Sequence, residues 1–255
     1  MPSINDTFYA PNDAKNFTAY NYPRNSKKGE IILLDFYGAV FDADGTLLDS
    51  MHVWRNLGKL YLLKRGITPE EDLSARLWPL SYSQGCEYIR RHYGIHESVS
   101  EIQAGISRMI EGFYRNEAKL KPGVHEFLCE LRLRDIHMVI ATSGDRELLS
   151  AALDRNNVAQ YFDGIFTCSE LGTDKHDSKI YLVCAESLGL YPERIAVFED
   201  VLYAIETAKS AGFITFGVED ESSINDRQRI IDTADYYIND WRQINREDGI
   251  NDSRQ

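Results

Sequence analysis

Five short apolar runs, hardly interrupted by polar residues, constrain the fold of this chain more than any other feature. Runs of this kind are typical of strands that are buried on both faces of a parallel sheet. From the second run onward, segments with apolar residues at helical spacing alternate with them. This alternation predicts an α/β fold with a doubly wound parallel sheet. The runs are Ile31 to Phe41, Met138 to Thr142, Gly164 to Thr167, Ile195 to Phe198 and Phe213 to Val218.

The segment between the first two runs has a purely helical pattern. Trp54, Leu57 and Tyr61 share one helical face, and Thr68 to Glu71 reads as a capping box that would begin another helix. Core packing alone would explain each apolar helical face. Taken together, however, a helical insertion inside an α/β sheet predicts a cap over the strand ends. We therefore expect an all-helical cap domain at 51–120, inserted into a core made of 31–50 and 121–241.

Both ends of the chain are polar. Residues 1–30 have no periodic apolar face, so they predict a flexible N-terminal extension of undetermined role, and 242–255 predict a frayed polar tail.

The net charge and the cysteine content exclude several kinds of binding partner. A net charge of −12 over 255 residues argues against a nucleic-acid or anionic-membrane surface. The four cysteines lack metal-ligand spacing, and no apolar run approaches the ~20 residues that cross a bilayer. Without a recognisable signal peptide, we expect a cytoplasmic protein; the sequence leaves monomer and homodimer open.

Polar residues follow each predicted strand, where ligands bind in an open parallel sheet. Four loops would bring carboxylates, a hydroxyl and an amine to one edge of the sheet. They are Asp42, Asp44 and Thr46 after the first run, Thr142, Ser143 and Gly144 after the second, Lys175 after the third, and Glu199 and Asp200 after the fourth.

This set meets the needs of phosphate-ester hydrolysis. A carboxylate such as Asp42 can attack phosphorus and form an acyl phosphate, which splits the reaction into two steps. Attack by an anion on an anion requires positive charge, which Mg²⁺ on Asp200 and the ammonium of Lys175 would supply. Asp44, close to Asp42, could then protonate the leaving alcohol.

Four segments resemble the motifs of haloacid-dehalogenase-superfamily phosphatases with a helical cap, similar to the phosphoglycolate phosphatase and β-phosphoglucomutase subfamily. FDADGTLLDS at 41–50 resembles the first motif, VIATSG at 139–144 the second, KHDSKIY at 175–181 the third and VFEDVLYAIETAKSAG at 197–212 the fourth. The third lacks the usual prolines, and spacing to Ile180 favours Lys175 over Lys179. The resemblance implies a Rossmann-like core.

The resemblance also implies roles for the site residues. Thr142 would bind the phosphoryl group, and Mg²⁺ would be held by the Asp42 carboxylate, the Asp44 backbone carbonyl and Asp200 or Glu199. Which of the last two binds the metal directly is left open. Substrate contacts are expected from Thr46, Ser143, Gly144, Arg146 and His52. Asp49 and Ser50 are expected to cap the first cap helix.

The motif residues favour one reaction over its relatives. Asp44 points to a phosphate ester with an oxygen leaving group, because dehalogenases and phosphonate hydrolases of this superfamily lack it. Thr46 favours hydrolysis over a sugar phosphomutase of the β-phosphoglucomutase type, which carries an apolar residue there and a histidine where Trp54 stands. A non-enzymatic phospho-receiver domain lacks both the Asp42–Asp44 spacing and the helical insertion.

The expected substrate is a small phosphorylated metabolite, by resemblance a sugar or polyol phosphate. Phosphoglycolate and nucleoside monophosphates remain alternatives, because the cap selects the substrate and its pattern does not name one.

Overall fold

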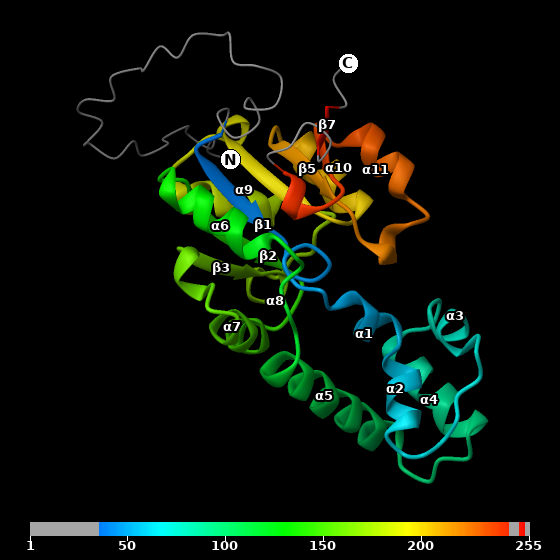
Figure 1. The fold of residues 1–255 in the computed structure, drawn as a ribbon. Coiled ribbons are helices and arrows are strands. Elements are labelled where there is room, and N and C mark those ends of the chain that lie inside the picture. Colours follow the sequence, from blue (N-terminus) through cyan, green and yellow to red (C-terminus); the bar gives the residue numbers. More distant parts are fainter. Residues whose placement is uncertain (1–35, 245–249, 253–255) are drawn as a thin grey trace, which may run out of the picture.

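The computed structural model describes residues 36–244 and 250–252. Its centre is a seven-stranded sheet in the order β3-β2-β1-β4-β5-β6-β7, in which every neighbouring pair is parallel except β6 and β7 (Figure 1). The predicted doubly wound parallel sheet is confirmed. The strands are β1 (Gly38–Phe41), β2 (His137–Thr142), β3 (Gly164–Thr167), β4 (Ile195–Glu199), β5 (Ile214–Val218), β6 (Tyr236–Ile238) and β7 (Ile250–Asp252).

Helices cover both faces of the sheet because successive strand residues point to opposite sides. Phe41 packs toward α6, α7 and the short helix η4, while Val40 packs toward α9 and α10. These helices are α6 (Val124–Leu133), α7 (Arg146–Arg155), α9 (Lys179–Leu188), α10 (Leu202–Ser210) and η4 (Trp241–Gln243). Shorter helices complete the layers at α8 (Cys168–Leu171), α11 (Arg227–Thr233), η1 (Ala159–Tyr161), η2 (Pro192–Arg194) and η3 (Glu221–Ser223).

Between β1 and β2 the chain leaves the sheet and forms a helical unit to one side of it (Figure 1). This unit, the cap, has a separate apolar core that includes Tyr61, Leu62, Ile89 and Ile102. Its helices are α1 (Met51–Arg55), α2 (Leu57–Leu63), α3 (Leu73–Leu77), α4 (Tyr82–His92) and α5 (Val99–Asn116). The long helix α5 runs back to the core and packs on α7.

The predicted helix start at Thr68 was wrong, since α3 begins only at Leu73. Glu70, inside the expected first turn, is used otherwise: its carboxylate contacts His92 at 2.8 Å, and its backbone N–H donates to the hydroxyl of Tyr93. Capping boxes form instead at Ser81 and Ser98, where α4 and α5 begin.

The predictions for the two ends of the chain have different outcomes. The predicted flexible extension at 1–30 lies outside the described residues. The segment expected to be a polar tail contributes β7, which pairs antiparallel with β6. Neither of these short strands was predicted, because three residues are too few for a periodic pattern.

Strand order and register determine where the site lies. β1 lies between β2 and β4, with Phe41 opposite Ile140 on one side and Phe198 on the other. The Asp42 N–H then donates to the Phe198 carbonyl at 2.9 Å. The carboxyl ends of three adjacent strands therefore meet at one edge, beside the two segments that join cap to core.

Candidate active site

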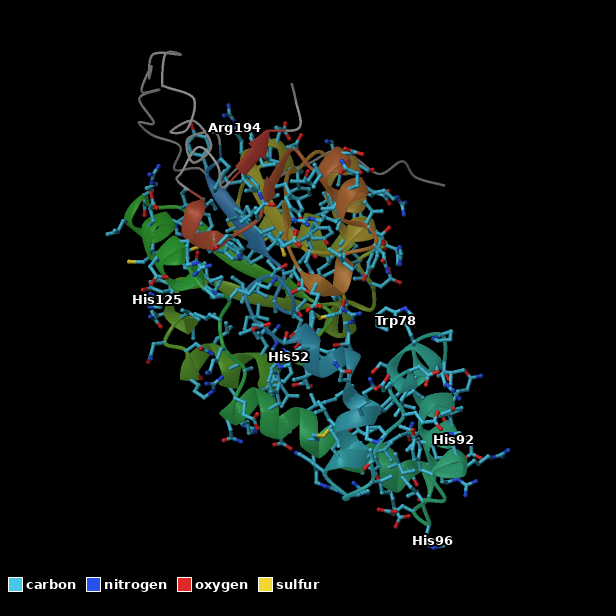
Figure 2. The ribbon with its side chains drawn as sticks, turned by 45° about the vertical axis from the view of Figure 1, so that its right-hand side comes forward. His52, Trp78, His92, His96, His125 and Arg194 are labelled. Atoms are coloured by element: carbon cyan, nitrogen blue, oxygen red, sulfur yellow. The ribbon has the colours of Figure 1, made fainter. Side chains whose placement is uncertain are left out.

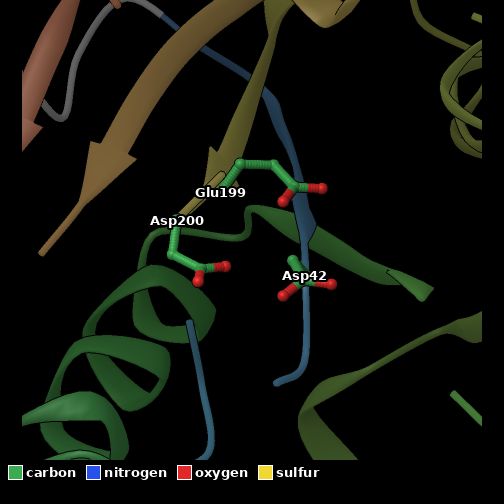
Figure 3. Close-up of side chains that lie close together, drawn as sticks. All are labelled: Asp42, Glu199 and Asp200. Atoms are coloured by element: carbon green, nitrogen blue, oxygen red, sulfur yellow. The ribbon is translucent and has the colours of Figure 1, made fainter. Parts of the chain in front are cut away.

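Three carboxylates from the ends of β1 and β4 converge at this edge. A carboxylate oxygen from each of Asp42, Glu199 and Asp200 lies within 4.8 Å of the others, and all three residues are buried. Figure 3 shows the three side chains pointing toward one another. Asp44 lies next to them at the beginning of the following turn, so four carboxylates gather in a small volume.

Lys175 is the ammonium that faces this cluster. It is buried, and its Nζ contacts Asp42 Oδ1 and, at 2.7 Å, Glu199 Oε1. Burial alone would lower the pKa of Lys175, but the charges of Asp42 and Glu199 outweigh it and raise that pKa. Lys179, the alternative considered above, is exposed and donates to the Leu171 carbonyl instead. The structure therefore places Lys175 in the cluster and Lys179 outside it.

The remaining carboxylates are in an environment that disfavours their charge. Burial, with Asp42 nearby, raises the pKa of Glu199 to about 7 and moves that of Asp200 well above its usual range. Glu199 Oε2 and Asp200 Oδ2 are buried without a hydrogen-bond partner. Unpaired carboxylate oxygens are costly in such a place unless a cation binds them.

A hard divalent cation fits these residues. Mg²⁺ binds oxygen ligands, and two orphaned carboxylate oxygens beside Asp42 offer such ligands around one position. Lys175 supplies one positive charge against four carboxylates, so a divalent ion would also relieve their mutual repulsion. Tyr181 donates to Glu199 Oε1 at 2.8 Å and so occupies the oxygen that Lys175 also uses, which leaves Oε2 free.

Asp44 is held differently from the other carboxylates. Its Oδ1 accepts hydrogen bonds from Ser50 Oγ at 2.6 Å and from the hydroxyl of Tyr114 on α5. Burial raises the pKa of Asp44, and these two hydrogen bonds oppose the rise. Ser50 precedes α1 as expected, but its side chain makes no capping hydrogen bond. Its hydroxyl serves the carboxylate instead.

The loop after β2 lies next to Asp44. The Gly144 N–H donates to Thr142 Oγ1 at 2.9 Å, and Thr142 is buried at the end of the strand. A methyl group on Gly144 would come within 3.2 Å of Thr142 Oγ1 and 3.4 Å of Asp44 Oδ2. Ser143 is exposed and approaches Cys168 Sγ at 3.5 Å. The backbone at residue 144 thus comes close to both side chains, and Asp44 Oδ2 faces this loop.

Two other residues predicted to contact the substrate are bound within the protein. Thr46 is buried and donates to Asp200 Oδ1 at 3.3 Å, so its hydroxyl supports the carboxylate cluster. Arg146 is bound by Glu170 and by the Ile165 carbonyl. These contacts direct its guanidinium toward α8 and β3.

His52 is exposed on α1 and lies where the cap meets the core (Figure 2). Its ring packs edge-on against Phe113, and its Nδ1 lies 3.7 Å from Asp49. Trp78 lies at the edge of the cap and is 72% exposed (Figure 2).

Sequence reasoning missed three side chains that contact the carboxylates or their partners: Tyr114, Trp54 and Tyr181. Trp54 Nε1 donates to the Tyr114 hydroxyl at 3.0 Å, and Tyr114 in turn reaches Asp44. Each of the three lies on the apolar face of a helix and reads as core. The signal that could have separated Tyr114 and Tyr181 is a hydroxyl at a buried position, because such a group needs a partner. Trp54 is 37% exposed and offers no such signal.

Comparisons with known proteins agree with this geometry. A family model described as haloacid dehalogenase-like hydrolase matches residues 39–218, so the chain belongs to this family. The predicted family is confirmed, and with it the class of enzyme, a hydrolase. No helix in the described part of the chain is long and apolar enough to cross a membrane.

Individual relatives carry more specific names. The chain is 27% identical over 196 residues to a phosphorylated carbohydrates phosphatase of Thermotoga maritima, covering 76% of this chain and 90% of that protein. It is 28% identical over 181 residues to hexitol phosphatase A of Escherichia coli, covering 69% and 79%. A solved structure of a candidate β-phosphoglucomutase from Thermotoga maritima superposes with a TM-score of 0.72 and 25% identity, covering 82% of this chain and 96% of that one.

Gly45 provides a test of the turn that follows Asp44. Its φ is +87°, and a methyl group there would collide with Asp200 Oδ2. Gly66 also has a positive φ, +71°, but has open space around it. We expect Gly66→Ala to cost about 1 kcal/mol of unfolding free energy and to keep activity, because only the backbone preference is lost.

Gly45→Ala should in addition lower turnover on the order of 10²-fold, because it displaces a carboxylate of the cluster. Thermal melts and initial rates of both variants check this. Equal behaviour of the two variants would show that the space around Gly45 does not matter.

Proposed function

We propose that this chain is a Mg²⁺-dependent phosphatase that hydrolyses a small phosphorylated sugar or polyol through an aspartyl-phosphate intermediate. The observation that carries the proposal is the division between two neighbouring carboxylates. Asp42 is paired with Lys175, whereas Asp44 is held by neutral hydroxyls next to the Thr142–Gly144 loop. A nucleophile needs the first environment and a general acid the second.

In the first step an Asp42 oxygen forms a bond to phosphorus while the bond from phosphorus to the leaving oxygen breaks. Asp44 transfers its proton to that oxygen, which leaves as an alcohol. Thr142 and the backbone of the loop at Gly144 would orient the phosphoryl group, and Lys175 would balance its charge. A bound Mg²⁺ at Glu199 and Asp200 would neutralise phosphoryl charge.

In the second step water attacks phosphorus of the aspartyl phosphate and gives a proton to Asp44. The bond between phosphorus and the Asp42 oxygen breaks, inorganic phosphate is released, and both carboxylates return to their starting states. Asp44 therefore serves as acid in one step and base in the next, so its placement affects both.

The names of the relatives support a carbohydrate-like substrate, since two of them are called phosphatases of phosphorylated carbohydrates and of hexitols. A phosphomutase is the second candidate, supported by the structural neighbour described as a candidate β-phosphoglucomutase. Hydrolysis is favoured because Trp54 stands where the mutase has a histidine, and because Thr46 stands where the mutase has an apolar residue. The proposal places the enzyme in the cytoplasm with a small metabolite as its partner.

Removing the proposed nucleophile should abolish turnover but not folding. We expect Asp42→Asn to lower turnover by several orders of magnitude, because an amide cannot form the acyl phosphate. Lys175 keeps Glu199 as a partner in that variant, so circular dichroism and the melting temperature should stay close to wild type. Asp135→Asn, at an exposed turn, is the matched control and should keep full activity. Substantial turnover by Asp42→Asn would place the nucleophile elsewhere.

Removal of divalent cations tests the metal assignment. We expect EDTA to abolish hydrolysis of p-nitrophenyl phosphate and added Mg²⁺ to restore it, because the cluster then lacks the charge needed to accept a phosphate. Mg²⁺ should also raise the melting temperature, since it binds the folded state alone. An unchanged rate in EDTA would count against a metal-dependent reaction.

A substrate panel separates phosphatase from mutase. We expect release of free phosphate from sorbitol 6-phosphate or a related sugar phosphate, faster than from phosphoglycolate or nucleoside monophosphates. β-Glucose 1-phosphate with a trace of its bisphosphate should be included, and both glucose 6-phosphate and free phosphate measured. Glucose 6-phosphate without free phosphate would establish a mutase instead.

A further inference from the structure

Two aromatic residues of the cap reach the proposed general acid from outside the core. Tyr114 lies in the last turn of α5, and Trp54 lies on α1. Their rings meet edge to face with centroids 6.4 Å apart, and the Trp54 indole N–H donates to the Tyr114 oxygen at 3.0 Å. The Tyr114 hydroxyl contacts Asp44 Oδ1. The two residues and the carboxylate therefore form a continuous hydrogen-bonded chain.

The donor and acceptor groups of these residues fix the direction of each hydrogen bond, from Trp54 to Tyr114 and from Tyr114 to Asp44. An indole N–H can only donate, so the Tyr114 oxygen is the acceptor of that bond. The hydroxyl proton of Tyr114 is then free for Asp44, and Tyr114 donates it to Asp44 Oδ1. Ser50 donates to the same carboxylate oxygen at 2.6 Å.

Two donors on Oδ1 decide which oxygen of Asp44 can carry the acidic proton. A carboxyl oxygen that accepts from Ser50 and Tyr114 has no room for a proton of its own, so the proton belongs on Oδ2. Oδ2 is the oxygen that faces the Thr142–Gly144 loop, since a methyl group on Gly144 would lie 3.4 Å from it. That loop is where the proposed function places the phosphoryl group.

We propose that Tyr114, supported by Trp54, is a positioning residue that directs the proton of Asp44 toward the leaving group. This rests on the proposed function, in which Asp44 is the general acid. When the bond between phosphorus and the leaving oxygen breaks, the proton moves from Oδ2 to that oxygen. The negative charge that remains on Asp44 is stabilised at Oδ1 by the two hydroxyl donors. Trp54 keeps Tyr114 in its donating orientation.

The test compares esters that differ in their need for an acid. p-Nitrophenolate leaves without a proton, whereas the alkoxide of sorbitol 6-phosphate requires one. We expect Tyr114→Phe to slow the first-turnover formation of phosphoenzyme from sorbitol 6-phosphate by about 10- to 100-fold, within the range of acid catalysis. With p-nitrophenyl phosphate the first-turnover rate should stay within about threefold of wild type, since no proton is transferred. Trp54→Phe should show the same selectivity with a smaller loss.

Tyr61→Phe is the matched control, because Tyr61 is also buried in the cap and its hydroxyl has no hydrogen-bond partner. It should change neither rate. Equal slowing of both esters by Tyr114→Phe would mean a structural role, and no slowing of either would mean no role. Each of these results overturns the proposal.

The hydrogen-bond chain is also measurable without substrate. The proton NMR signal of the Trp54 indole N–H should move upfield in Tyr114→Phe, where its acceptor is gone, and stay in place in Tyr61→Phe. A wild-type protein inert toward both esters would count against the proposed function alone, while an indole signal unmoved by Tyr114→Phe would overturn the positioning proposal.

Discussion

The structure depends on how four carboxylates can share one edge of a sheet with a single ammonium. At an effective dielectric constant near 20, two like charges ~4 Å apart repel each other by about 4 kcal/mol. Lys175 offsets part of this by bridging Asp42 and Glu199. Burial, together with the repulsion that remains, raises the pKa values of Glu199 and Asp200, so the pocket is poorly suited to stability and well suited to capturing a cation.

Neutral donors divide the carboxylates into two groups. Thr46 donates to one oxygen of Asp200, and Tyr181 donates to one oxygen of Glu199. The second oxygen of each carboxylate is left free for a metal. Ser50 and Tyr114 serve one oxygen of Asp44 and leave the other facing the loop after β2. In both groups a hydroxyl on one oxygen determines what the second oxygen can do.

The linear order of the chain predicted the sheet and most of the charged cluster, because the ends of parallel strands must meet at one edge. Asp42, Glu199 and Lys175 could be placed together for that reason. The hydrogen bonds to Asp44 could not, since Tyr114 is 70 residues away and lies on an apolar helical stripe. Arg146 also follows β2, but position along the chain alone could not show that Glu170 binds its guanidinium.

Under the proposed function, the tryptophan on α1 would give the cap a part in the chemistry. Trp54 lies just after the segment that enters the cap, and Tyr114 lies just before the one that leaves it. The hydrogen bonds from Trp54 to Tyr114 and from Tyr114 to Asp44 therefore require both segments to be in place, and the proposed acid would be aligned only in that arrangement. A histidine at position 54 could donate or accept and would titrate near neutral pH, whereas an indole N–H only donates at every pH. Tryptophan thus keeps Tyr114 directed at Asp44, which suits the proposed hydrolase, whose acid would need one fixed orientation while the phosphoryl group passes to water.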